Sequence, residues 1–195
     1  MSKNQKIYSM TATALMTAII CVLAPFSVPI GPVSLTLQNF VIGLAAVILG
    51  WKMATASCAI YLLLGMIGVP VFSRHLSGVD KIVGPTGGYL IGFLLFAAIG
   101  GFLINLAVKN WGLRDIKTWI ASVVSLAIGD AVLYVVGTIW FMYIQQVSLP
   151  VALGYCVFPF IGPDLIKFVL AAGLGLGVRS ALAHAGILNA AVQKA

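Results

Sequence analysis

Long apolar stretches follow one another along almost the whole chain, and they constrain the fold more than any other feature of the sequence. Six of them approach the roughly twenty residues with which a helix crosses a bilayer: residues 8–24, 35–50, 53–71, 87–108, 118–143 and 164–183. Of the 195 residues, 62% are hydrophobic and only 8% are charged, and the mean hydropathy is +1.13. So few charges cannot cover the surface of a water-soluble domain of this length. The sequence therefore predicts an all-α integral membrane protein with six transmembrane helices, in which residues 1–195 form a single domain.

The formal net charge of +7 is carried by basic residues that stand singly between the apolar stretches. Because they form no stripe or cluster, they do not indicate a nucleic-acid partner. They do indicate an orientation, since basic residues concentrate on the cytoplasmic side of a membrane protein. Eight of them lie on the side of the two chain ends, namely Lys3, Lys6, Lys52, Lys109, Arg114, Lys117, Arg179 and Lys194, and three lie on the other side, namely Arg74, Lys81 and Lys167. The sequence thus predicts that both termini are cytoplasmic.

Motifs of catalysis and metal binding are missing from the sequence. Cys21, Cys58 and Cys156 are odd in number and far apart, so they indicate neither a disulfide framework nor a metal site. The segment GPTGGY lacks the Gly-Lys-Ser/Thr ending of a nucleotide-binding loop, and neither HExxH nor a Ser-His-Asp set is found. We therefore expect no enzyme activity, no metal and no cofactor.

The three connections predicted at the outer face each contain Gly-Pro before the next helix, at Gly31-Pro32, Gly84-Pro85 and Gly162-Pro163. Proline suits the first helical turn, and a preceding glycine gives the chain freedom to turn. The inner connections GWKM and KNWGLRDIK contain no proline. We therefore expect three helices to begin at the Gly-Pro positions, with N-termini that favour an anionic ligand.

An acid and a base, Asp164 and Lys167, stand three residues apart in the segment FPFIGPDLIK, just inside an otherwise apolar stretch. At this spacing they share one face of a helix. They form either a local ion pair at the start of the helix or part of a ligand cavity. In a cavity, Asp164 accepts hydrogen bonds from N–H groups of a ligand, while Lys167 pairs with a carboxylate or holds Asp164 in place. Charges are costly at membrane depth, and other polar residues share the same predicted face, so the sequence favours the cavity.

The other polar residues of the predicted outer face complete the set of candidate ligand contacts: Gln38, Asn39, Arg74, Thr86 and Tyr89. Gln38 can both donate and accept hydrogen bonds, as an amide-like ligand requires. Arg74 and Lys81 are candidates to attract a carboxylate, and each is equally well explained as a solvated loop charge.

Asp130 is a second acidic residue of interest, because it falls inside the predicted fifth helix. Counting from Lys117 at about 1.5 Å per residue places it past the middle of the membrane, towards the outside. A carboxyl group there must face the interior of the bundle or be protonated. Two interpretations stay open: Asp130 lies under the ligand cavity, or it bonds Tyr134 one turn further on.

In the first predicted helix, Ala14 and Ala18 are small residues four positions apart. This spacing lets a second helix approach closely. Because such pairs are common in membrane helices, packing within the six-helix bundle is one explanation of this pair.

Five motifs give the whole chain a resemblance to a known family. They are GPVSLTLQN at 31–39, LLLGMIGVPVFS at 62–73, GPTGGYLIGF at 84–93, GDAVLYVVGTIWF at 129–141 and FPFIGPDLIK at 158–167. In this order and spacing they resemble the BioY family, the substrate-binding S components of energy-coupling factor (ECF) transporters for biotin.

The resemblance implies an S-component fold in a bacterial cell membrane and a biotin pocket that opens outward. It also implies a transmembrane T component and two cytoplasmic ATPases as partners, with Ala14 and Ala18 in the contact with the T component. Asp164 and Lys167 match the family's acid and base at the start of the sixth helix and carry over as ligand contacts. The stretch SRHLSGVDK departs from the glycine-rich pattern of relatives, which leaves the roles of Arg74, Asp80 and Lys81 open.

Two alternatives to a biotin-binding subunit remain at the level of the sequence. One is an S component for a different vitamin. The other is a self-sufficient secondary carrier in which Asp130 or Asp164 takes up a proton, although the sequence contains no convincing repeat of the kind that carriers show.

Overall fold

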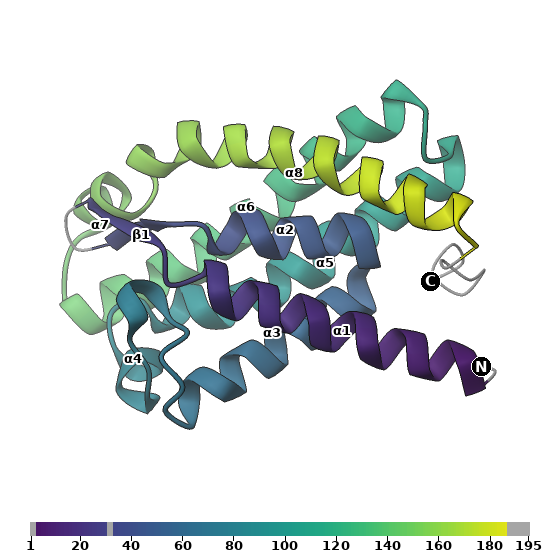
Figure 1. Cartoon of the computed structure of the whole chain (residues 1–195). Coiled ribbons are helices and arrows are strands. Elements are labelled where there is room, and N and C mark those ends of the chain that lie inside the picture. The colour runs from purple at the N-terminus through teal and green to yellow at the C-terminus, as the bar shows by residue number, and fades with distance from the viewer. Residues whose placement is uncertain (1–2, 31–32, 187–195) are drawn as a thin grey trace.

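The long helices run lengthwise through the molecule, and a β-hairpin and short helices lie at one end (Figure 1). The computed structural model describes residues 3–30 and 33–186. The helices are α1 (Lys3–Leu23), α2 (Gln38–Leu49), α3 (Trp51–Met66), α4 (Val79–Val83), α5 (Gly87–Trp111), α6 (Ile116–Gln145), α7 (Leu149–Cys156) and α8 (Phe158–His184), with a short 3-10 helix η1 at Ser73–His75. The strands β1 (Ser27–Ile30) and β2 (Val33–Thr36) pair antiparallel, with Ser27 opposite Thr36.

Each of the six predicted apolar segments forms a helix. Four stretches within the described residues are long and apolar enough to cross a membrane: Gln5–Leu23, Gly87–Trp111, Ile116–Gln145 and Leu149–His184. Helices α2 and α3 are apolar but shorter. The protein is therefore a mostly helical membrane protein, as predicted.

The structure differs from the predicted fold in several details. The connection before α2 contains the hairpin β1–β2, so the fold is not purely α-helical, and the helix predicted at 35–50 begins at Gln38. The helix predicted at 164–183 begins at Phe158, which places Pro163 inside α8 rather than at its start. Short helices α4 and α7 occupy connections that were predicted as loops.

The expectation of three helices beginning at Gly-Pro holds for one of them. Gly84-Pro85 directly precedes the N-cap of α5, Thr86. Gly162-Pro163 lies within α8. Gly31-Pro32 falls outside the described residues, and the element that follows it is strand β2 rather than a helix. The Gly-Pro positions therefore do not provide three helix N-termini that would favour an anion.

Helix α2 lies at the centre of the bundle. It packs against α8, α5, α3 and α1, and ten of its twelve residues are buried. Around it, α5 and α6 form the most extensive helix pair. Glycines make this pair close: a Cβ at Gly129 of α6 would lie 3.0 Å from the carbonyl oxygen of Phe96 in α5, and small residues are what allow backbones in membranes to approach to this degree.

The N-terminal end of α1 and the C-terminal end of α8 lie at the same end of the bundle, opposite the hairpin, α4 and α7 (Figure 1). The turn between α2 and α3 lies at the end of the chain termini as well, and Arg179 of α8 stabilises it. Arg179 is 2% exposed and donates hydrogen bonds to the carbonyl oxygen of Val47 and to Oδ1 of Asn105, at 3.1 Å each. The Val47 carbonyl belongs to the last turn of α2, where the helix offers no N–H partner, and a cation is favourable there. Arg179 thus ties α8 and α5 to the C-terminal end of α2.

We expect Arg179→Gln to lower the free energy of unfolding by about 1–3 kcal/mol, since buried acceptors would lose a charged donor. Thermal unfolding of the detergent-purified protein measures this loss, and Arg114→Gln, at an exposed arginine, is the matched control. Equal melting temperatures of the two variants would contradict a stabilising role for Arg179.

Candidate functional site

A cavity opens at the end of the bundle that carries the hairpin, α4 and α7. Counted with its open mouth, it contains about 860 Å³ of space free of protein atoms. Apolar side chains make up a large part of the wall: Val33, Leu35, Phe72, Leu90, Phe93, Leu133, Cys156 and Phe160. Polar and charged residues make up about half of the lining, and apolar surface with hydrogen-bonding groups among it is typical of a site for a small organic molecule.

All seven residues predicted as ligand contacts line this cavity: Gln38, Asn39, Arg74, Thr86, Tyr89, Asp164 and Lys167. They come from α2, η1, α5 and α8 and from the N-cap of α5. Folding thus brings together polar residues that are up to 129 positions apart in the sequence, from Gln38 to Lys167. Their contact with a ligand itself stays a prediction.

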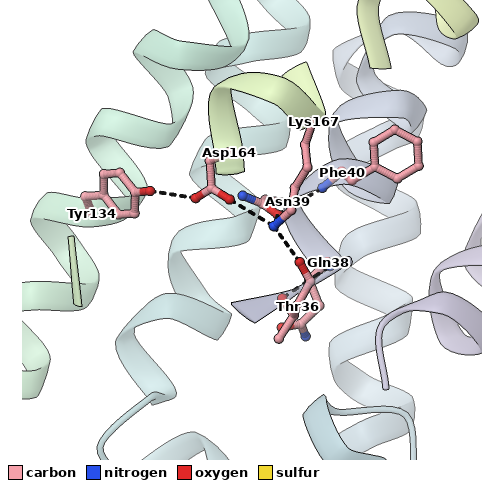
Figure 2. Close-up of polar contacts among 7 residues, drawn as sticks. All are labelled: Thr36, Gln38, Asn39, Phe40, Tyr134, Asp164 and Lys167. Carbon is pink, nitrogen blue, oxygen red and sulfur yellow. Dashed lines mark hydrogen bonds and ion pairs between the residues drawn. The ribbon is translucent and has the colours of Figure 1, made fainter. Parts of the chain in front are cut away.

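Asp164 and Lys167 form the centre of the polar network in the cavity (Figure 2). Lys167 Nζ lies 2.9 Å from Asp164 Oδ1, as their i, i+3 spacing on α8 predicted. The same ammonium group donates to the carbonyl oxygen of Thr36 at 2.7 Å and to Oδ1 of Asn39 at 3.1 Å. These three acceptors match the three hydrogens of an ammonium group, so Lys167 joins β2, α2 and α8 and holds Asp164 in place.

The other carboxylate oxygen of Asp164 is held by α6. The Tyr134 hydroxyl donates to Asp164 Oδ2 at 2.5 Å (Figure 2). Asp164 is only 4% exposed, and it lies in the second turn of α8 because the helix begins at Phe158. Asp164 and Lys167 thus form the local ion pair of one interpretation, but they lie deeper than the helix start and line the cavity, as the other interpretation predicted.

Gln38 and Tyr89 each form a hydrogen bond with the hydroxyl group of a neighbouring side chain. The Gln38 side-chain amide donates to the Tyr61 hydroxyl of α3. The Tyr89 hydroxyl lies 3.0 Å from Thr138 Oγ1 of α6. The ring of Tyr89 lies over Gly137, where an added Cβ would come within 2.3 Å of the ring, so a glycine is required there for Tyr89 to occupy its place in the wall.

Arg74 and Lys81 bring positive charge to the cavity from the segment between α3 and α5. Arg74 is exposed and adopts a left-handed backbone conformation with φ 63° and ψ 30°, which is strained for a residue with a side chain. Its N–H donates to the Pro25 carbonyl oxygen at 3.0 Å, and Ser73 Oγ donates to Ser27 Oγ at 3.1 Å. These bonds tie the segment to the hairpin. Burial lowers the pKa of Lys81, and the nearby Arg74 charge lowers it further.

The sequence did not single out Tyr134 as a residue of the cavity, and it gave no signal for the apolar wall. Tyr134 could have been found from its position one turn after Asp130, since a polar group repeated at i, i+4 marks one face of a helix. Phe72, Phe93 and Leu133 look like ordinary core residues in the sequence, and only the fold distinguishes them.

Asp130 is buried in α6 and 3% exposed, and it does not belong to the cavity wall, whereas Leu133 and Tyr134 of the same helix do. Its Oδ1 has no hydrogen-bond partner among residues 3–30 and 33–186. The hydroxyl hydrogen of Tyr134 goes to Asp164. Asp130 therefore lies behind the cavity wall, and it also interacts with Tyr134 and Asn39, so the structure supports both interpretations in part.

Ala14 and Ala18 are both exposed on α1. Packing within the bundle, which was one explanation of this pair, is therefore wrong. Large apolar residues accompany them on the exposed side of α1, including Met10 at 73%, Leu15 at 63% and Val22 at 64% exposure. This face is free to contact lipid or another membrane helix.

Together, the fold and the cavity define a class of protein, namely a helical multi-pass membrane protein with an interior site for a small molecule. The sequence profile of the BioY family matches residues 1–184. The chain belongs to the BioY family, as the five motifs indicated.

Individual relatives agree with this assignment. Biotin transporter BioY2 of Lactococcus lactis subsp. cremoris is 40% identical over 184 residues, which cover 93% of this chain and 96% of that protein. Biotin transporter BioY of Thermotoga maritima is 38% identical over 167 residues, which cover 85% and 92%. A crystal structure of the S-component for biotin from an ECF-type ABC transporter has a TM-score of 0.83 at 32% identity, with 92% of this chain and 95% of that chain covered. The fold is therefore that of an ECF S component.

Proposed function

We propose that this protein binds biotin from outside the cell and delivers it inward as the S component of an ECF transporter. The observation that carries the proposal is the Asp164–Lys167 pair, which lines one cavity together with five other predicted contacts. Relatives described as biotin transporters, similar over more than four-fifths of the chain, support biotin as the ligand.

The chemistry of the cavity suits the two ends of biotin. The ureido ring offers N–H donors and one acceptor, and Asp164 with Gln38 supplies the complementary groups. Lys167 already donates to three acceptors, so its role in this proposal is to hold Asp164 rather than to bind the ligand's carboxylate. That carboxylate would instead lie near Arg74 and Lys81, while the apolar bicycle and tail contact the apolar wall.

In the membrane, the proposed arrangement is six crossings in one domain, with α2 and α3 as a short antiparallel pair and both termini cytoplasmic. The positive-inside distribution of the basic residues supports this orientation, and so do the neighbouring ends of α1 and α8 (Figure 1). The cavity then opens outward. A T component and two ATPases complete the transporter in this proposal, with the T component docking on the exposed alanine face of α1.

Binding of tritiated biotin to the purified protein, challenged with unlabelled biotin, thiamine or riboflavin, tests the choice of ligand. We expect unlabelled biotin alone to displace the label, because the cavity pairs a carboxylate acceptor at one end with cations at the other. Displacement by either of the other vitamins at similar concentration would contradict biotin as the specific ligand.

A further inference from the structure

Asp130 is a buried acidic group for which the binding site described above has no use. It is 3% exposed, and its Oδ1 has no hydrogen-bond partner in the described part of the chain. A carboxylate in that position would be an uncompensated negative charge in a medium of low dielectric constant. A protonated carboxyl group would carry no such cost.

The titratable, charged and polar side chains that interact with Asp130 come from four helices, its own α6 included: Asn39 of α2, Tyr89 of α5, Tyr134 of α6, and Asp164 and Lys167 of α8. Among these, Lys167 is the one cation, and its three hydrogens point to Thr36, Asn39 and Asp164. Lys167 therefore compensates one carboxylate, that of Asp164. A second negative charge on Asp130 would repel the charge of Asp164 and would have to share Lys167 with it.

Tyr134 connects Asp130 to the ligand site. It lies one helical turn from Asp130, so the two side chains share a face of α6, and its hydroxyl donates to Asp164 (Figure 2). A tyrosine hydroxyl has a single hydrogen. If Asp130 were ionised, it would compete with Asp164 for that hydrogen and add negative charge next to the site.

We propose that Asp130 is a positioning residue that is protonated while the site binds its ligand, and that this proton keeps the Tyr134 hydroxyl on Asp164. Loss of the proton would draw the Tyr134 hydroxyl away from Asp164 and misplace the carboxylate that accepts from the N–H groups of the ligand. The inference rests on the proposed function for the identity of that ligand, biotin.

The test is the affinity of the purified full chain for biotin from about pH 6 to about pH 9, in the wild type, Asp130→Asn and Lys81→Met. Asparagine imitates the protonated acid in shape and cannot ionise. We expect Asp130→Asn to bind as the wild type does at neutral pH, to within about twofold, and to lose the weakening by about tenfold or more that the wild type shows at alkaline pH. Lys81→Met removes a cation of the cavity whose pKa is also lowered by burial and by Arg74, and it should keep the alkaline weakening.

Two results would overturn the proposal. One is the same pH profile in the wild type and Asp130→Asn; the other is a loss of affinity at neutral pH in a folded Asp130→Asn protein. A wild type that binds no biotin at any pH would instead refute the proposed function.

Infrared spectroscopy provides a readout that does not require a folded variant. The chain has four carboxylic side chains, and of these Asp80 is exposed, Asp115 caps α6 by accepting from the Lys117 N–H, and Asp164 is ion-paired. The C=O stretch of a protonated carboxylic acid should therefore be visible in the wild type at neutral pH and should disappear at alkaline pH. Its absence at neutral pH would also overturn the proposal, and in a folded Asp130→Asn protein the band should be missing.

Discussion

Replacing Asp164 with asparagine should weaken biotin binding by about 1–3 kcal/mol, roughly five- to 150-fold in Kd. Asp164 is the buried acceptor on which the proposed site depends, because Lys167 and Tyr134 fix both of its oxygens at the cavity wall. An asparagine amide keeps the shape but loses the charge and one of the two acceptor oxygens. Lys167 would then be a buried cation without its anion, which adds to the cost. Equilibrium binding of tritiated biotin to the purified variant measures the effect.

The matched control for this variant is Asp80→Asn. Asp80 is exposed on α4 and does not line the cavity, although its neighbour Lys81 does. We expect this control to bind biotin as the wild type does. A folded Asp164→Asn protein with unchanged affinity would remove Asp164 from the site, and the proposed position of the ureido ring with it.

Replacing both Ala14 and Ala18 with leucine should reduce ATP-driven biotin uptake by about tenfold or more while leaving biotin binding unchanged. Small residues let two membrane helices approach closely, and leucines would hold their axes apart. Both alanines are exposed, so the substitution creates no clash within the protein itself. Uptake into proteoliposomes that contain the T component and the ATPases measures transport, and the isolated protein gives the binding affinity.

Exposed alanines on other helices provide the control for this second prediction. Ala131 on α6 and Ala181 on α8 are exposed as well, and leucine at both should leave uptake unchanged. Normal uptake by the Ala14/Ala18 variant would exclude this face as the docking surface. Accumulation without ATP, driven by a proton gradient, would instead favour a secondary carrier.

The number and order of the apolar helices could be predicted because a stretch of about twenty apolar residues is long enough to cross a bilayer as a helix. The polar residues of the site could be predicted for the complementary reason: in a chain with 8% charged residues, Asp164 and Lys167 are too costly at membrane depth to be there without a partner. The connections between helices alternate between the two faces of the membrane, so the starts of α2 and α5 were predicted on the same face as this pair. The sequence could therefore also predict that Gln38, Asn39, Thr86 and Tyr89 lie near it.

Other parts depend on contacts that are distant in the sequence. The hairpin has strands of four residues each, which are too short for a period of two to stand out. Proline normally marks a helix start or a break, yet Pro163 lies six residues into α8, so the start of this helix was misplaced. The apolar wall of the cavity cannot be distinguished from the core in a sequence that is apolar nearly throughout.

The central position of α2 has a consequence for biogenesis. Its twelve residues span about 18 Å, less than the hydrocarbon thickness of a bilayer, and neighbouring helices rather than lipid surround most of its surface. On its own it is a poor substrate for insertion, so α2 and α3 should enter the membrane as one helical hairpin. Because α8 follows α2 to α7 in the chain and contacts α2 through both Lys167 and Arg179, the site should form only after α8 has been synthesised.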